Sequence, residues 1–208
     1  MTIRRLATLA AAAAALAVGA PAGADTLPQG GGANNVVIVK TGTDGASPVR
    51  AHTQVAQTAS PTVTSSNVAT ATATGCTGCH ATAVAVQVLM VTDAPQYFTP
   101  RNAAAAVNSG CTRCGTFAYA WQYVVQVDGP ARLSASGRAE VQELEQQIAD
   151  ASGSVVPATL ADDLALQAKL DGLTSRLRAV IDAEVEQGNV SLVRGPAVHK
   201  RVSFDEPS

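Results

Sequence analysis

The chain has 208 residues, a formal net charge of −2 at pH 7, and a hydrophobic content of 47% that is mostly alanine and valine, with 3% aromatic residues. A nearly neutral chain without a clustered basic face is not typical of a nucleic-acid-binding protein. Because alanine buries little apolar area, a core of this composition gains more than usual from covalent cross-links.

The first 24 residues have the pattern of a secretory signal peptide. A basic start, Arg4-Arg5, precedes an apolar run over residues 6–20, and a small-x-small cleavage site ends at Ala24. The apolar run is shorter than the roughly 20 residues of a membrane span, and no later run is long and uninterrupted enough to replace it. We therefore expect a mature chain that is secreted or held in the cell envelope, with no membrane span.

After a predicted flexible leader over residues 25–33, residues 34–75 are rich in short β-branched runs. Thr43-Asp-Gly45 is a turn signal, and the stretch from Val68 to Thr74 alternates with period two. This pattern predicts a small antiparallel β meander. A disordered stalk rich in threonine and alanine is the alternative.

Residues 76–133 are a predicted core in which one sequence unit occurs twice. Gly75-Cys-Thr-Gly-Cys79 returns as Gly110-Cys-Thr-Arg-Cys114, and Gln87 returns as Gln122, always at an offset of 35. A fixed period indicates one supersecondary unit that buries its apolar face against its neighbour. We expect the aromatic face of the second copy to cover the face of the first copy that is rich in alanine and valine, and Trp121 to be buried.

The secondary structure of the repeated unit is ambiguous from its pattern. Residues 117–123 alternate aromatic and other side chains as a strand does, but the segment 114–127 is long for a strand and ordinary for a helix. Four positions of the first copy also fall on one helical face: Cys79, Ala83, Val86 and Met90. We therefore expect a helix in each copy. A second helix, capped at Thr99-Pro100 or at Ser134, then returns the chain so that both cysteine pairs lie at one pole.

Residues 134–187 read as a helical hairpin, broken around Ser152-Gly-Ser154. Its second arm has apolar residues at alternating spacings of four and three, and a polar residue takes the next place in the series: Leu166, Leu170, Leu173, Leu177, Val180 and then Glu184. The hairpin is acidic, which indicates either a solvated face or a docking surface for a cationic partner. The tail, residues 188–208, is predicted to be disordered. The predicted fold class is thus α+β: a small N-terminal β meander, a duplicated helical Cys-x-x-Cys core and a helical hairpin.

The cysteines are the candidate site: Cys76, Cys79, Cys111 and Cys114. An even count in an exported chain favours disulfides, either local or between the two copies. Two Cys-x-x-Cys pairs are also typical of a zinc site, and a Cys-x-x-Cys at a helix start is typical of a thiol–disulfide exchanger. Cys76-Thr-Gly-Cys79-His80 matches the attachment motif of c-type haem, although Gly115 takes the place of His80 in the second copy.

Several segments of the sequence resemble a known kind of domain: residues 67–79, 83–87, 99–108, 111–114 and 128–138. They resemble the extracytoplasmic C-terminal domain of actinobacterial proteins labelled putative peptide zinc metalloproteases, and stand-alone exported proteins of that type. The resemblance covers roughly residues 34–186, and the doubled Cys-Thr-x-Cys is its most specific part. The protease label does not carry over, because the protease portion is absent and no His-Glu-x-x-His occurs around His52, His80 or His199. The resemblance implies a disulfide-type exported module without an established activity.

These observations predict an exported, disulfide-stabilised structural or interaction module with an extracytoplasmic protein partner. We expect no enzymatic activity, no bound nucleic acid and no cofactor, with zinc or haem c as the exceptions that the cysteine motifs leave open. The alternative is an extracytoplasmic thiol–disulfide or c-type haem electron-transfer protein.

Overall fold

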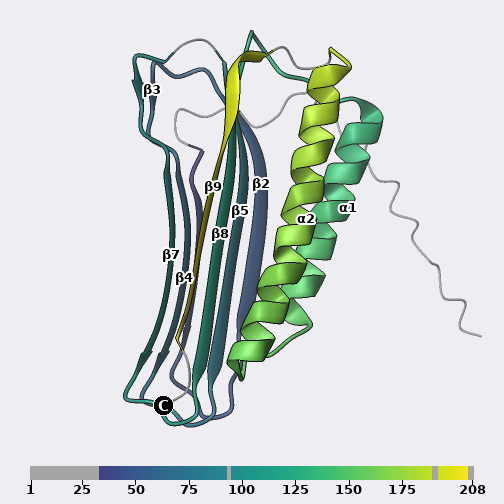
Figure 1. The fold of residues 1–208 in the computed structure, drawn as a ribbon. Coiled ribbons are helices and arrows are strands. Elements are labelled where there is room, and N and C mark those ends of the chain that lie inside the picture. Colours follow the sequence, from purple (N-terminus) through teal and green to yellow (C-terminus); the bar gives the residue numbers. More distant parts are fainter. Residues whose placement is uncertain (1–32, 93–94, 189–191, 206–208) are drawn as a thin grey trace, which may run out of the picture.

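The computed structural model describes residues 33–92, 95–188 and 192–205 (Figure 1). The predicted signal peptide and nearly all of the predicted leader lie outside these residues. The described strands and helices follow one another as β1 (Asn35–Thr41), β2 (Val49–Thr58), β3 (Thr62–Val63), β4 (Ser66–Thr74), β5 (His80–Thr92), β6 (Tyr97–Phe98), β7 (Arg101–Ser109), β8 (Gly115–Val127), α1 (Ala135–Gly153), α2 (Leu160–Glu186) and β9 (Leu192–Asp205).

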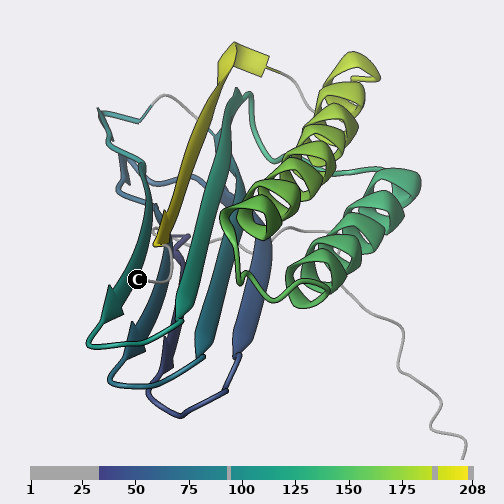
Figure 2. The ribbon, with the colours of Figure 1, turned by 60° about the horizontal axis from the view of Figure 1, so that its bottom comes forward.

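The strands form a short parallel β-solenoid. One sheet has the order β1-β4-β7, a second has the order β2-β5-β8-β9, and β3 pairs with β6. All pairs are parallel except that of β8 with β9. In the described residues the chain passes from the first sheet to the second three times, from β1 to β2, from β4 to β5 and from β7 to β8. Each passage belongs to one coil of the solenoid. Figure 2 shows both helices on the outer face of the second sheet.

The 35-residue offset of the sequence is the length of one coil. His80 pairs with Gly115, and Gln87 pairs with Gln122 on the neighbouring strand. The predicted duplicated helical core is wrong, since the segments expected to be helical are β5, β7 and β8. Both faces of β5 and β8 are covered, so they read as continuous apolar runs that lack the alternation of a half-exposed strand.

The predicted antiparallel meander is also wrong, although residues 34–75 do form strands. Its strands are spread over different coils and pair in parallel, at offsets of 32 for Asn35 with Asn67 and of 33 for Gln54 with Gln87. This stretch contains a complete first coil of the solenoid. Its sequence has diverged so far that only two copies stand out in the chain.

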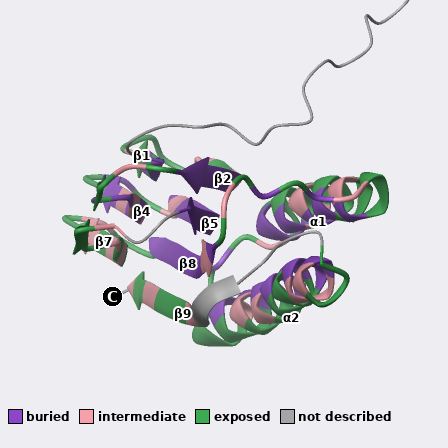
Figure 3. Ribbon diagram, turned by 90° about the horizontal axis from the view of Figure 1, so that it is seen from above, coloured by how far each residue is buried: buried purple, intermediate pink, exposed green. Residues whose placement is uncertain are grey.

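The core has two layers, one on each side of the second sheet, which lies between the β1-β4-β7 sheet and the helices in Figure 3. The space between the two large sheets is filled by small side chains such as Ala71, Ala83 and Ala118. Alanine fills little volume, and Cα atoms of β4 come within 8 Å of Cα atoms of β8, closer than the usual sheet spacing of about 10 Å. The other layer, between the second sheet and the helices, holds the large side chains.

The aromatic residues of β8 point toward the helices. Phe117, Tyr119 and Tyr123 are fully buried there, and Trp121 is 5% exposed. Burial of Trp121 is confirmed. The expected packing of this aromatic face onto the first copy is wrong, because the two copies lie edge to edge in one sheet and the helices cover both.

Amide ladders connect the coils inside the solenoid. The Nδ2 of Asn35 donates to Oδ1 of Asn67 at 2.9 Å, and Nδ2 of Asn67 donates to Oδ1 of Asn102 at 2.7 Å. A glutamine ladder repeats the arrangement on the second sheet, with Gln122 donating to Gln87 at 2.7 Å and Gln87 to Gln54 at 2.8 Å. Buried amides require partners, so the register of each coil is set by the one beside it.

The predicted hairpin stretch contains α1 and α2. Ser134 is the N-cap of α1, and Thr159 is the N-cap of α2; in each case the side chain accepts a hydrogen bond from a backbone N–H of the first turn. The leucines of the predicted series on α2 are buried in the layer above β8. Tyr119 donates a hydrogen bond to Asp171 of this helix at 2.9 Å.

The predicted disordered tail is wrong over residues 192–205, which form β9. This strand runs antiparallel to β8 and also covers the edge of β7, where Ser203 Oγ and Asp205 Oδ2 accept hydrogen bonds from the backbone N–H groups of Ala106 and Asn108 at 3.2 and 2.8 Å. Edge strands need such cover. A segment with few apolar side chains can provide it, because backbone hydrogen bonds supply most of the pairing. Neither described helix is long and apolar enough to cross a membrane.

Candidate functional site

The four cysteines lie in two stacked turns at one end of the solenoid. The turn 75–79 joins β4 to β5, and the turn 110–114 joins β7 to β8. Thr77 and Thr112 form a parallel bridge, and Gly78 donates to the carbonyl of Thr112 at 2.8 Å. Thr112 in turn donates to the carbonyl of Cys76 at 3.1 Å. These backbone bonds hold equivalent cysteines one above the other.

Each turn requires two residues with positive φ. Gly75 and Gly110 begin the turns at φ of 63° and 61°. Gly78 has φ of 62°, and Arg113 takes the same place in the next coil at φ of 56°. A residue with a Cβ costs roughly 1–2 kcal/mol in this region. Arg113 nevertheless has the same conformation as Gly78. This conformation directs Cys114 inward, as that of Gly78 directs Cys79.

The four sulfur atoms converge, and all lie within 4.8 Å of one another. Cys76 and Cys79 are at disulfide-bonding distance. Cys114 Sγ lies 3.0 Å from Cys79 Sγ, and Cys111 Sγ lies 3.8 Å from Cys76 Sγ and 3.9 Å from Cys79 Sγ. Three of the cysteines are buried, whereas Cys111 is half-buried. The prediction that both pairs share one pole is confirmed, but stacked coils bring them together and not helices that run out and back.

The two unpaired thiols have different environments. Burial raises the pKa of Cys114, and the neighbouring Cys111 adds to that effect. Burial also acts to raise the pKa of Cys111, but hydrogen bonds with Cys114 and with the backbone groups of Cys76, Ser109 and Gly75 outweigh it and hold the pKa below its usual value. Ionisation therefore occurs first at Cys111, the more exposed of the two.

The cluster suits some of the chemistries that the motifs left open and not others. Four sulfurs this close can form disulfides within a turn or between turns. They can also surround one tetrahedral ion, since Zn–S bonds of about 2.3 Å place thiolates roughly 3.8 Å apart. Attachment of haem c does not fit, because the sulfurs of Cys76 and Cys79 lie close to those of the other two cysteines, and the two residues are only 4% and 0% exposed.

His80, the third element of the haem motif, has a structural partner. Its Nδ1 lies 3.0 Å from the carbonyl oxygen of Pro157, in the loop between α1 and α2. In the next coil this loop passes over Gly115, where an added Cβ would collide with the Pro157 carbonyl and lie 2.9 Å from His80 Nδ1. The difference between the two copies at this position therefore follows from the helical hairpin that covers them.

The first coil has an equivalent turn without cysteines. Gly45, at φ of 68°, donates to the carbonyl of Thr77, and Asp44 Oδ1 accepts from the Thr77 backbone N–H at 2.7 Å. Thr43 and Ala46 stand at the two cysteine positions. This coil was not predicted from the sequence. The signals that identify it are Gly45, Gln54 and Asn35, each at nearly one coil length before its counterpart.

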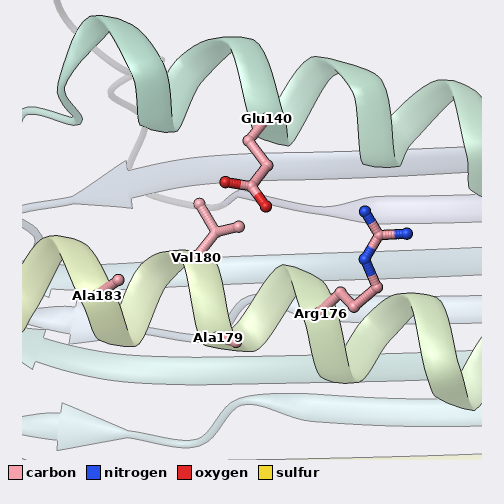
Figure 4. A pocket seen from close by; sticks show the side chains of 5 residues that line it. All are labelled: Glu140, Arg176, Ala179, Val180 and Ala183. Atoms are coloured by element: carbon pink, nitrogen blue, oxygen red, sulfur yellow. The ribbon is translucent and has the colours of Figure 1, made fainter.

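A shallow pocket also lies between the two helices, with a volume of about 230 Å³. Glu140 on α1 and Arg176 on α2 flank a floor of small apolar side chains (Figure 4). This lining combines no nucleophile with a general base. The cysteine cluster is therefore the candidate functional site.

Comparison of the chain with protein-family models, curated proteins and solved structures finds no match.

Proposed function

We propose that the chain is an exported structural or interaction module whose solenoid is cross-linked by disulfides in its cysteine turns. The observation that carries this proposal is the convergence of the four sulfurs at adjacent coils, with Cys76 and Cys79 at bonding distance. The predicted signal peptide adds an oxidising destination, in which such thiols pair.

Cross-links are important for the stability of this solenoid because of the composition of its interior. The layer between the two large sheets is mostly alanine, so it contributes little apolar burial per residue. In the chain-entropy model, a disulfide within one turn contributes about 2 kcal/mol, and one that joins adjacent coils about 4 kcal/mol. Either value is a substantial share of the ~5–15 kcal/mol of a typical domain.

The interaction part of the proposal is supported by the outer face of the β1-β4-β7 sheet. Val36 and Ile38 on β1 and Val107 on β7 are 53%, 48% and 46% exposed. Apolar side chains left exposed on the outer face of a sheet suit contact with another protein, here an extracytoplasmic partner.

Peptide mapping of the secreted protein tests the cross-links. Free thiols are blocked with N-ethylmaleimide, and the denatured protein is digested with trypsin before and after reduction. Cleavage at Arg101, Arg113 and Arg132 puts Cys76 and Cys79 on one peptide, Cys111 on a second and Cys114 on a third. Local disulfides leave the first peptide separate and link the other two, whereas disulfides between coils link all three. Four blocked thiols would contradict the proposal.

A thiol–disulfide exchange centre is a second candidate, favoured by the thiol of Cys111 beside the Cys76–Cys79 bond. In an exchange step, the Cys111 thiolate attacks one sulfur of that bond, a new disulfide forms, and the other sulfur leaves as a thiolate. No external oxidant is needed. If exchange occurs, protein with two free thiols, held for increasing times before blocking, will change from local to inter-coil linkage. A fixed linkage pattern would leave only the structural role.

A further inference from the structure

We propose that the four cysteines, once reduced, form a tetrathiolate site for a single Zn²⁺ ion that joins the second and third coils. The inference rests on the same cluster as the proposed function but concerns its reduced state. It follows from the position of the sulfurs, their burial and the backbone that holds them.

The geometry fits one ion. The four Sγ atoms lie within 4.8 Å of one another, and the distances of Cys111 to Cys76 and to Cys79 are 3.8 and 3.9 Å. A tetrahedral zinc site with Zn–S bonds of about 2.3 Å requires thiolates roughly 3.8 Å apart. Reduction lets Cys76 and Cys79 separate to that distance, and a small rotation does the same for Cys79 and Cys114. The backbone can therefore remain in place.

The ligand set selects the kind of metal. Four thiolates favour soft or borderline cations in tetrahedral geometry, which among common divalent ions means zinc, whereas magnesium and calcium prefer oxygen ligands. Each Cys-x-x-Cys turn supplies two ligands, as in structural zinc sites. The 31 residues between the pairs form the rest of one coil, and the parallel register of β5 with β8 removes the need for a short spacer.

The environment suits a structural ion. Cys79 and Cys114 are 0% and 1% exposed, and the turns are bonded to each other through Gly78, Thr112 and Gly115. All four coordination positions would be filled by protein, which leaves none for a substrate. Binding of Zn²⁺ to four thiols releases four protons to the solvent. Reduction of Cys76–Cys79 beforehand takes two electrons from an external reductant. A thiol reductant also supplies the two protons, whereas with a phosphine they come from water, whose oxygen is retained in the phosphine oxide.

The test uses the full secreted chain, reduced with a phosphine under anaerobic conditions and desalted. Co²⁺ serves as the spectroscopic probe, followed by Zn²⁺. We expect one equivalent of Co²⁺ to give the intense visible bands of tetrahedral coordination and a thiolate charge-transfer band, and one equivalent of Zn²⁺ to abolish both. Failure to bind Co²⁺, or the pale spectrum of octahedral coordination, would overturn the proposal.

The ligand variant is Cys111→Ser, and Thr112→Ala, at an exposed side chain in the same turn, is its matched control. We expect the control to bind like the wild type. The ligand variant should lose the tetrathiolate spectrum and bind at least about tenfold more weakly, since loss of even an outer partner costs 10–100-fold. Equal binding by both would overturn the proposal. If either reduced protein unfolds, circular dichroism must show that Zn²⁺ restores the fold of the control and not of Cys111→Ser.

Two outcomes separate this inference from the proposed function. Metal analysis and native mass of the protein as isolated show which state it occupies. Disulfides without zinc, together with no metal binding after reduction, would overturn the zinc site and leave the cross-linked module. Four thiols with one bound zinc would contradict the disulfide module and support the site.

Discussion

The carboxylate of Glu184, near the end of α2, binds Ser134, the N-cap of α1. Glu184 Oε2 accepts from the Ser134 backbone N–H at 2.8 Å, and Oε1 accepts from its hydroxyl at 2.6 Å. Glu184 is 3% exposed, and a Cβ added at Gly137 would collide with it. A carboxylate here also faces the positive end of the α1 dipole.

We predict that Glu184→Ala lowers the free energy of unfolding by about 2–3 kcal/mol, because hydrogen bonds to a charged group are lost and the partly buried backbone N–H of Ser134 loses its acceptor. Urea denaturation followed by circular dichroism measures the loss. Glu186→Ala, at an exposed position on the same helix, should change stability by less than about 0.5 kcal/mol. Equal effects of the two substitutions would contradict the role of Glu184.

Two glycines should respond to alanine with opposite signs. Gly115→Ala places a Cβ against Pro157 and His80, and we expect a loss of about 1–3 kcal/mol from overpacking. Gly172 lies within α2, where an added Cβ meets nothing within 4 Å. Gly172→Ala should therefore raise stability by about 0.5–1 kcal/mol. Thermal unfolding of both variants checks the pair, and destabilisation by Gly172→Ala would contradict the described packing of α2.

Trp121 should be a core residue and not part of a binding surface. Its ring lies 6.0 Å from that of Tyr123, under the helices. We expect Trp121→Ala to cost about 3–5 kcal/mol, and the wild-type tryptophan emission to be blue-shifted and protected from quenchers. Val107→Ala, on the exposed face of β7, is the control and should have little effect. A red emission that is freely quenched in the native protein would contradict this packing.

Two tyrosines should resist ionisation in the folded protein. Burial raises the pKa of Tyr119 and of Tyr123, and the carboxylates of Asp171 and Asp182 act in the same direction. Because the folded pKa values exceed the ordinary value of about 10, the stability contributed by these phenols is fully present below that pH and is lost as pH rises through the folded pKa values. The free energy of unfolding should therefore fall above about pH 10.

The measurement is a titration of tyrosinate absorbance alongside circular dichroism. Tyr97 is 68% exposed, so Tyr97→Phe leaves only the two buried phenols. In this variant, tyrosinate should appear together with the loss of structure. Ionisation at ordinary tyrosine pH in a protein that is still folded would contradict the burial of these side chains.

The sequence alone determined the features that depend on local pattern or on exact repetition. The 35-residue offset and the shared pole of the four cysteines could be predicted, because equal units meet at equal positions. The burial of Trp121 was also predicted, but the helices cover it and not the first copy. Ser134 could be predicted as an N-cap because a hydroxyl residue precedes the helical pattern. The leucine series of α2 could be predicted because it follows the period of a half-buried helix.

Tertiary structure decided the rest, for a physical reason that β5 and β8 make clear. A strand covered on both faces has no alternation, so its apolar run cannot be distinguished from a buried helix until its neighbours are known. The same holds for β9, which is ordered by pairing with β8 and by side chains that cover β7. The first coil was also hidden, because its register is set by the amides of Asn35 and Gln54 and not by cysteines. Whether an extended segment pairs, and with what, depends on contacts 32 to 97 residues away, which no local window of sequence contains.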